Sequence, residues 1–190
     1  MTPRKSGAER RLEIIETTLR LAAVAGPDSI SADAIARELG ISQPAIFRHF
    51  PKKDDIWIAA LDWLAATLRD LWAESLERAP GGRVLSTLVG DHLDFITSHP
   101  ALPQVLLSPD LQARYQPVRQ ITACLTSMLH AAVERAALAD GLPLAEGRTA
   151  WLVVSLIQGL ALRWTNSGRA FDLRSEGLAM LDLTLTGVRG

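Results

Sequence analysis

The sequence has little of what secreted, disulfide-bonded or membrane-inserted proteins need. Its 190 residues include one cysteine, Cys124, which excludes an intrachain disulfide and fits a reducing cytosol. Cys124 lies between apolar residues and is predicted to be a small core side chain. The N-terminus lacks the apolar stretch of a signal peptide. The longest apolar run, Trp151 to Leu162, contains polar and glycine interruptions and is shorter than the about 20 residues that cross a bilayer. We therefore expect a soluble cytoplasmic protein without a membrane partner.

The motifs of common enzyme classes are also missing. The four histidines lack the His-Glu-x-x-His spacing of a metalloprotease, and one cysteine is too few for a cysteine-rich zinc site. No Gly-x-Gly-x-x-Gly or Walker loop is present. A Ser-His-Asp triad is not excluded by sequence, but nothing points to one. We expect no catalytic residue, no metal site and no cofactor, and a small-molecule enzyme stays an alternative without a supporting motif.

No excess of positive charge marks the whole chain as a nucleic-acid binder. It has 20 Lys and Arg against 21 Asp and Glu, a net charge of −1, so any nucleic-acid footprint must be local. Hydrophobic residues make up 48%, which is enough for a packed core and argues against disorder. Basic residues gather in two places, Arg4, Lys5, Arg10 and Arg11 in one and Arg48, His49, Lys52 and Lys53 in the other. Solvated surface charge is the alternative explanation for both clusters.

The apolar residues of the first fifty positions have the spacing of three helices. The first helix carries a stripe through Leu12, Ile15, Leu19 and Ala22 and ends at Gly26-Pro27. The second begins at a cap provided by Ser29 or Ser31 and stops at Gly40. Ser42 is expected to cap the short third helix, with Pro44 tolerated in its first turn. These residues predict a three-helix head.

Helical periodicity continues through the rest of the chain, and no strand alternation or internal repeat is present. A long helix is expected after Phe50-Pro51, with Asp54 and Asp55 at its positive end, and it ends near residues 80–82. Further helices are predicted at about 83–98, 101–113, 116–139, 143–166 and 172–188. The predicted fold is all-α, with an N-terminal domain of residues 1–50 and a larger helical body of residues 51–190.

The stretch from Ser31 to Lys53, SADAIARELGISQPAIFRHFPKK, has the helix, glycine turn and short helix of a helix-turn-helix. Ile46 and Phe50 fall on one apolar face of the short helix. The remaining surface carries a glutamine, which can bond adenine, an arginine, which can bond guanine, and an alanine, which can touch a thymine methyl. Lys52 and Lys53 follow where lysines and free backbone amides can hold a phosphate. An ordinary αα-hairpin is the alternative.

The segment IARELGISQPAIFRHFPKKDDIW closely resembles the recognition region of the tetracycline-repressor-like (TetR/AcrR) family. The resemblance lies in Ile35-Ala36, Gly40, the run Phe47-Arg48-His49-Phe50, and Lys53, and it extends over residues 8–68. It implies a DNA-binding transcriptional regulator, most often a repressor, whose body dimerises and often holds a small-molecule effector. A protein of the same fold with a non-transcriptional role on DNA, for example in cell division, stays open.

The resemblance also implies roles for individual positions on double-stranded operator DNA. Base edges would be faced by Gln43, Pro44, Ala45 and Arg48. Phosphates would be lined by Ser31, Ser42, Phe47, His49 and Lys53. The family usually has tyrosine where this chain has Phe47, and phenylalanine cannot donate the phosphate hydrogen bond. We therefore expect weaker binding than with tyrosine, without a change of function.

The last two predicted helices are the candidates for a homodimer interface. A single recognition helix reads too few base pairs, so two heads are expected on half-sites about 34–36 Å apart. Two helices from each subunit could form a four-helix bundle. The candidate residues are Trp151, Val154, Gln158 and Leu162 on one helix and Leu178, Leu181 and Leu185 on the other. Packing within the chain is the alternative for each of them.

A small-molecule effector pocket is expected among the middle helices. These helices combine aromatic and aliphatic residues with a few polar groups, which describes a ligand cavity and equally an ordinary core. The candidate ligand-binding residues are Trp63, Trp72, Phe95, Arg119 and Met128.

Overall fold

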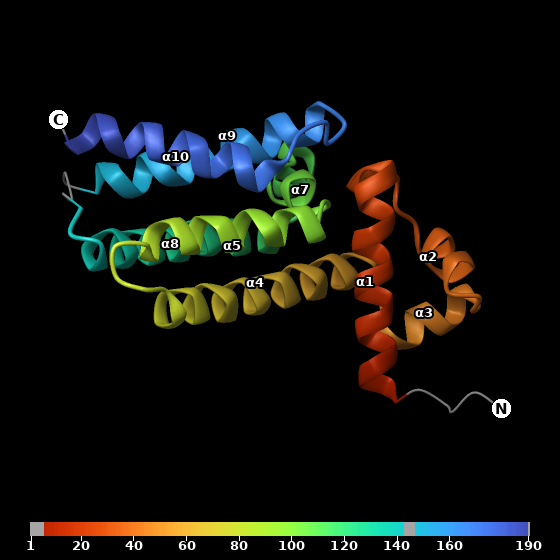
Figure 1. Cartoon of the computed structure of the whole chain (residues 1–190). Coiled ribbons are helices and arrows are strands. Elements are labelled where there is room, and N and C mark those ends of the chain that lie inside the picture. Colours follow the sequence, from red (N-terminus) through yellow and green to blue (C-terminus); the bar gives the residue numbers. More distant parts are fainter. Residues whose placement is uncertain (1–5, 143–146, 190) are drawn as a thin grey trace. The chain divides into compact units, whose positions relative to one another are not determined.

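The structure, a computed structural model, describes residues 6–142 and 147–189 (Figure 1). Every regular element in these ranges is a helix, which confirms the all-α prediction. The chain divides into two compact units. Unit 1 comprises Met1–Leu64 and His99–Ile121, and unit 2 comprises Ala65–Ser98 and Thr122–Gly190. No helix in the described ranges is both long and apolar enough to cross a membrane.

Unit 1 contains the N-terminal helices and a set of shorter helices from the middle of the chain. Its elements are α1 (Gly7–Ala25), the 3₁₀ helix η1 (Pro27–Ser29), α2 (Ala32–Glu38), α3 (Gln43–His49), the first part of α4 (Lys53–Arg78), α6 (Leu102–Leu106), α7 (Pro109–Arg114) and the first residues of α8 (Gln116–Ala139). Helices α2 and α3 pack on each other and on α1 (Figure 1). The core between them is aliphatic and aromatic, with Ile14, Ile35, Ile46, Phe50 and Trp57 all at most 2% exposed.

Two predicted caps of these helices have different outcomes. Ser31 caps α2, because its hydroxyl oxygen accepts from the Ala34 amide at 3.1 Å. Ser42 occupies the cap position of α3, but its side chain makes no capping hydrogen bond, so that prediction is wrong. Pro44 has no amide to offer, and the Ala45 amide donates to the Ser42 carbonyl oxygen instead. The Ser42 hydroxyl consequently stays exposed at the start of α3.

The single helix expected at about 101–113 is in fact two, α6 and α7. Pro109 cannot donate to the preceding turn and disfavours a helical Ser108, whose ψ is 112°. Ser108 instead caps α7 by accepting from the Leu111 amide at 3.2 Å. The predicted start of a helix at residue 143 lies outside the described residues, and the described helix α9 begins at Arg148.

Unit 2 is built from longer helices. These are the second part of α4, α5 (Val84–Ser98), most of α8, α9 (Arg148–Asn166) and α10 (Leu173–Arg189). Helix α10 packs against both α5 and α9. A Cβ added at Gly177 of α10 would lie 2.2 Å from a methyl carbon of Leu93. A larger residue here would therefore force the Leu93 side chain or the helix to move.

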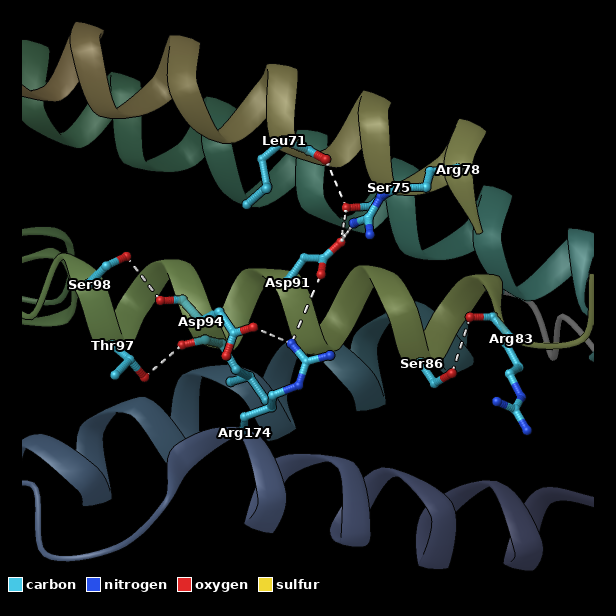
Figure 2. Close-up of polar contacts among 11 residues, drawn as sticks. Leu71, Ser75, Arg78, Arg83, Ser86, Asp91, Asp94, Thr97, Ser98 and Arg174 are labelled. Carbon is cyan, nitrogen blue, oxygen red and sulfur yellow. Dashed lines mark hydrogen bonds and ion pairs between the residues drawn. The ribbon is translucent and has the colours of Figure 1, made fainter. Parts of the chain in front are cut away.

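Charged side chains tie three helices of unit 2 together (Figure 2). Asp91 of α5 accepts from Arg78 of α4 at 2.6 Å and from the Ser75 hydroxyl at 2.6 Å. Arg174 of α10 pairs with Asp94 and lies 3.9 Å from the other carboxylate oxygen of Asp91. The Asp91 side chain is only 15% exposed, so this carboxylate is more shielded from water than an ordinary surface ion pair.

Another polar contact in unit 2 is a helix cap supplied by a residue far along the chain. Asp140, directly after α8, accepts from the amides of Val84 and Leu85 at 2.9 Å each. These are two of the amides that the first turn of α5 leaves unpaired, and a carboxylate also suits the positive end of the helix.

Cys124 is exposed on α8, so its predicted core position is wrong. Its sequence neighbours are apolar, but the helical repeat turns a different set inward. Leu125, Leu129, Ala132 and Val133 are the buried residues of this stretch, and their spacing leaves Cys124 on the outer face.

A buried histidine lies in the core of unit 2. The indole nitrogen of Trp72 donates to Nδ1 of His92 at 3.0 Å, so the imidazole is neutral with its proton on Nε2. Both side chains are buried. Burial lowers the pKa of His92 from 6.5 to about 4, because the charged imidazolium would lose its hydration.

We predict that this histidine makes the protein sensitive to acid. Between pH 6.5 and pH 4 the unfolded chain binds a proton on His92 that the folded chain does not. Stability is therefore lost as the pH falls through this window, by about 3 kcal/mol in total. Urea unfolding of the wild type and of His92→Phe across the window measures the effect. The variant should lose this part of the pH dependence, and parallel curves for the two proteins would contradict the prediction.

Candidate nucleic-acid interface

The turn between α2 and α3 has a defined geometry that the sequence dictates. The Ile41 amide donates to the Ala36 carbonyl oxygen at 3.0 Å, and the Gly40 amide donates to Arg37 at 3.2 Å. This pair of bonds is a Schellman motif, which requires a left-handed residue after the helix. Gly40 supplies it with a φ of +64°. This turn sets the direction in which the chain leaves α2. Helix α3 begins at Gln43, three residues after Gly40.

Helix α3 has one buried face and one exposed face. Ile46 and the following Phe50 are fully buried in unit 1. The opposite side presents the polar residues that the sequence predicted for base reading. Gln43, Pro44 and Arg48 are exposed, and Ala45 is half-buried. The four residues therefore occupy the outer side of α3, where a duplex could reach them.

The residues predicted to lie along phosphates are distributed over three elements. Ser42 and Phe47 of the α3 segment are exposed, with Phe47 at 39%, and His49 is half-buried. Ser31 is exposed at the start of α2. Its oxygen accepts from the Ala34 amide, which leaves the hydroxyl hydrogen able to donate to a phosphate. Lys53 is half-buried and is the first residue of α4.

The start of α4 corrects one detail of the sequence interpretation. The amide of Lys52 is not free to hold a phosphate, because it donates to the carboxylate of Asp55 at 2.9 Å. Asp55 thereby stabilises the first turn of α4. The Lys52 amide is therefore not one of the groups that could hold a phosphate at this end of α4.

Two arginines of α1 hold the helix-turn-helix, and sequence reasoning missed both roles. Arg20 pairs with Glu38 of α2 at 2.6 Å. Arg11 donates to the His49 carbonyl oxygen at the end of α3, and its guanidinium carbon lies 4.1 Å from the centre of the Phe50 ring. Helical spacing carried a signal for Arg11, because it lies four residues before the buried Ile15, although Arg11 itself is exposed.

The five candidate effector residues do not belong to one compact unit. Trp63 and Arg119 lie in unit 1, and Trp72, Phe95 and Met128 lie in unit 2. Trp72 and Phe95 are buried, Trp63 and Met128 are half-buried, and Arg119 is exposed. Trp63 lies 5.6 Å from the ring of His99.

The candidate dimer residues differ in how far they are exposed to solvent. Trp151 and Leu162 are exposed on α9, and Val154 and Leu181 are buried within unit 2. Gln158, Leu178 and Leu185 are half-buried. Large apolar side chains that the sequence did not single out are also exposed on α9 and α10, namely Leu152, Met180 and Leu183. Among the residues whose burial the structure describes, these two helices together carry five exposed large apolar side chains.

Comparison with known proteins links this geometry to a family. The family model described as bacterial regulatory proteins, tetR family, matches residues 14–60, which include all of α2 and α3. The structure is similar to that of a transcriptional regulator from Rhodococcus sp. Rha1, with a TM-score of 0.78 and 19% identity over 94% of this chain and 95% of that one.

Two further structures have the same fold. A tetR-family transcriptional regulator from Streptomyces coelicolor is 22% identical, covers 92% of this chain and 78% of its own, and has a TM-score of 0.71. The regulator FadR from Bacillus subtilis, solved in complex with stearoyl-CoA, is 17% identical over 93% of this chain and 98% of its own, with a TM-score of 0.72.

Proposed function

We propose that this chain is a DNA-binding transcriptional regulator of the tetR family, whose family model matches residues 14–60, and that it reads operator DNA with the outer face of α3. In this proposal it acts as a repressor that a small-molecule effector releases. The observation that carries the proposal is the two-sided character of α3. Ile46 and Phe50 are fully buried, so the helix can turn only its Gln43 and Arg48 side toward a duplex.

We assign the base-reading and backbone-binding roles as follows. Gln43 suits bidentate bonding to adenine and Arg48 to guanine, and Pro44 and Ala45 offer apolar contact to a thymine methyl. The Ser31 and Ser42 hydroxyls, the His49 imidazole and the Lys53 ammonium are donors for phosphates. Phe47 packs on the sugar-phosphate backbone without a hydrogen bond. The head of residues 1–50 is thus the DNA-binding domain, and residues 51–190 form the regulatory body.

The test is binding to duplex DNA from upstream of the protein's own gene, followed by fluorescence anisotropy over a range of salt concentrations. We expect saturable binding that prefers this DNA over a shuffled duplex and falls steeply with salt. Arg48→Ala should weaken binding by about 5- to 150-fold, because a bidentate base contact is worth about 1–3 kcal/mol.

The matched control is Arg69→Ala, which removes the same charge from an exposed position of α4 in unit 2. It should bind like the wild type. A wild type without preference over shuffled DNA, or equal affinities of wild type and Arg48→Ala, would overturn the assigned reading face.

Phe47→Tyr should bind the same operator more tightly, by up to about tenfold. The Phe47 ring is 39% exposed, so a hydroxyl on it can donate to a phosphate without being buried. Such a bond contributes about 0.5–1.5 kcal/mol. Affinities of both proteins at one salt concentration check this, and the ranking of operator variants should not change, since a phosphate contact carries no sequence information. Equal affinities would remove the idea.

We propose that α9 and α10 form a homodimer interface as a four-helix bundle. Exposed apolar side chains on both helices support this, because a monomer gains nothing by leaving Trp151 66% and Leu183 74% exposed. Trp151 and Leu162 would contact the partner, together with Leu152, Met180 and Leu183. Val154 and Leu181 are buried in their own unit and would support the interface from behind.

Leu183→Glu should therefore weaken the dimer by about 30-fold or more, the effect of losing a contact worth about 2 kcal/mol at the centre of an interface. Light scattering over a concentration series measures the dissociation constant. Leu138→Glu is the control, since Leu138 is also exposed, at 61%, but lies on α8. Equal dimerisation of the two variants would exclude α10 from the interface.

We infer that the effector acts by preferring one of two dimer geometries. An effector that binds the non-operator geometry about 100-fold more tightly supplies ~2.7 kcal/mol, which weakens operator binding without touching α3. The FadR structure with stearoyl-CoA makes long-chain acyl-CoA esters the first effector class to add to the operator complex. Trp72, Phe95 and Met128, the candidates that lie in unit 2, remain the candidate contacts.

A further inference from the structure

The side chain of Arg11 makes two contacts with the C-terminal end of α3. Its guanidinium donates to the backbone carbonyl oxygen of His49, the last residue of the helix. Its guanidinium carbon lies 4.1 Å from the centre of the Phe50 ring, which is the geometry of a cation–π contact. Phe50 is the C-cap of α3 and is fully buried. One side chain of α1 thus holds both the last carbonyl and the last core residue of α3.

These contacts satisfy a need that α3 cannot meet itself. The last four carbonyl groups of a helix have no partner within it, and the negative end of the helix favours a cation. With seven residues, α3 is also too short to be stable alone. Its orientation therefore depends on tertiary contacts, namely Ile46 and Phe50 in the core and Arg11 at the C-terminal end.

We propose that Arg11 is a positioning residue for the recognition helix and not a ligand of DNA. It fixes the end of α3 on α1 and thereby the angle at which Arg48, one residue before His49, meets a base pair. The basic cluster at the N-terminus suggests a phosphate-binding role instead. However, its two described members already have partners, since Arg10 pairs with Glu13 at 2.7 Å and Arg11 binds the end of α3. The inference rests on the proposed function of α3.

Two features distinguish positioning from phosphate binding. Removal of a phosphate ligand reduces the slope of log K against log salt by about 0.9, whereas removal of a positioning residue lowers affinity and leaves the slope unchanged. Lysine keeps the charge and can bind a phosphate, but it cannot lay a planar guanidinium on Phe50 while donating to His49. A phosphate role therefore predicts that Arg11→Lys binds nearly as well as the wild type, and a positioning role predicts that it does not.

The experiment compares full-length wild type, Arg11→Ala, Arg11→Lys and the matched control Arg10→Ala in operator anisotropy across a salt series. We expect both Arg11 variants to bind the operator about two- to tenfold more weakly, the effect of one lost hydrogen bond, with an unchanged salt slope and a reduced preference over shuffled DNA. Arg10→Ala should keep the wild-type preference. A slope reduced by about 0.9 in Arg11→Ala with near-normal affinity in Arg11→Lys would overturn the proposal, as would wild-type affinity in both variants.

A second measurement needs no DNA and separates this inference from the proposed function. Amide hydrogen exchange of the free proteins should show about two- to tenfold faster exchange in residues 43–50 of Arg11→Ala and unchanged exchange in residues 32–38. Unchanged exchange in α3 would overturn the positioning role even where DNA binds. A wild type without operator preference, combined with faster exchange in the variant, would overturn the proposed function and leave Arg11 as the residue that holds α3.

Discussion

The shortness of α3 is the constraint on which the rest of the head depends. Seven residues make about two turns, too few for a helix to persist without packing. The burial of Ile46 and Phe50 supplies both the stability and the rotational setting. A shift of one residue would turn the helix by about 100° and replace its outer face entirely. The DNA-contacting roles proposed for the outer residues of α3 therefore depend on the burial of Ile46 and Phe50.

Local chemistry made most of the head predictable from sequence. The Ile46 and Phe50 spacing and the glycine after α2 act within a few residues, and both have the predicted outcome in the structure. Of the two serines predicted as possible caps of α2, Ser31 is the cap. The wrong predictions for helix ends arose where two local interactions competed for the same backbone group or the same segment. The Ala45 amide prefers the Ser42 carbonyl oxygen to its hydroxyl, and Pro109 divides a helix that apolar periodicity alone made continuous. The roles of the outer residues on DNA remain predictions.

For residues 51–190, the sequence predicted the positions of most helices but not the contacts between them. The side-chain contacts that join these helices connect residues that are far apart along the chain, such as Asp91 with Arg174 and Trp72 with His92. Side-chain type and periodicity do not encode such pairs, because either partner alone is also compatible with a solvated surface. The close approach of α5 and α10 at Gly177 could not be predicted either. In the sequence alone, a glycine within a helix is only a poor helix former, because the residue that it will pack against is not known.

The Asp140 cap has a consequence for how unit 2 comes apart. The first turn of α5 relies on a carboxylate 56 positions later in the chain, at the point where α8 has just ended. Fraying of the end of α8 therefore strips the amides of Val84 and Leu85 of their acceptor, and fraying of α5 leaves the carboxylate without its donors. The two helix ends are thus coupled, so that loosening of one weakens the other.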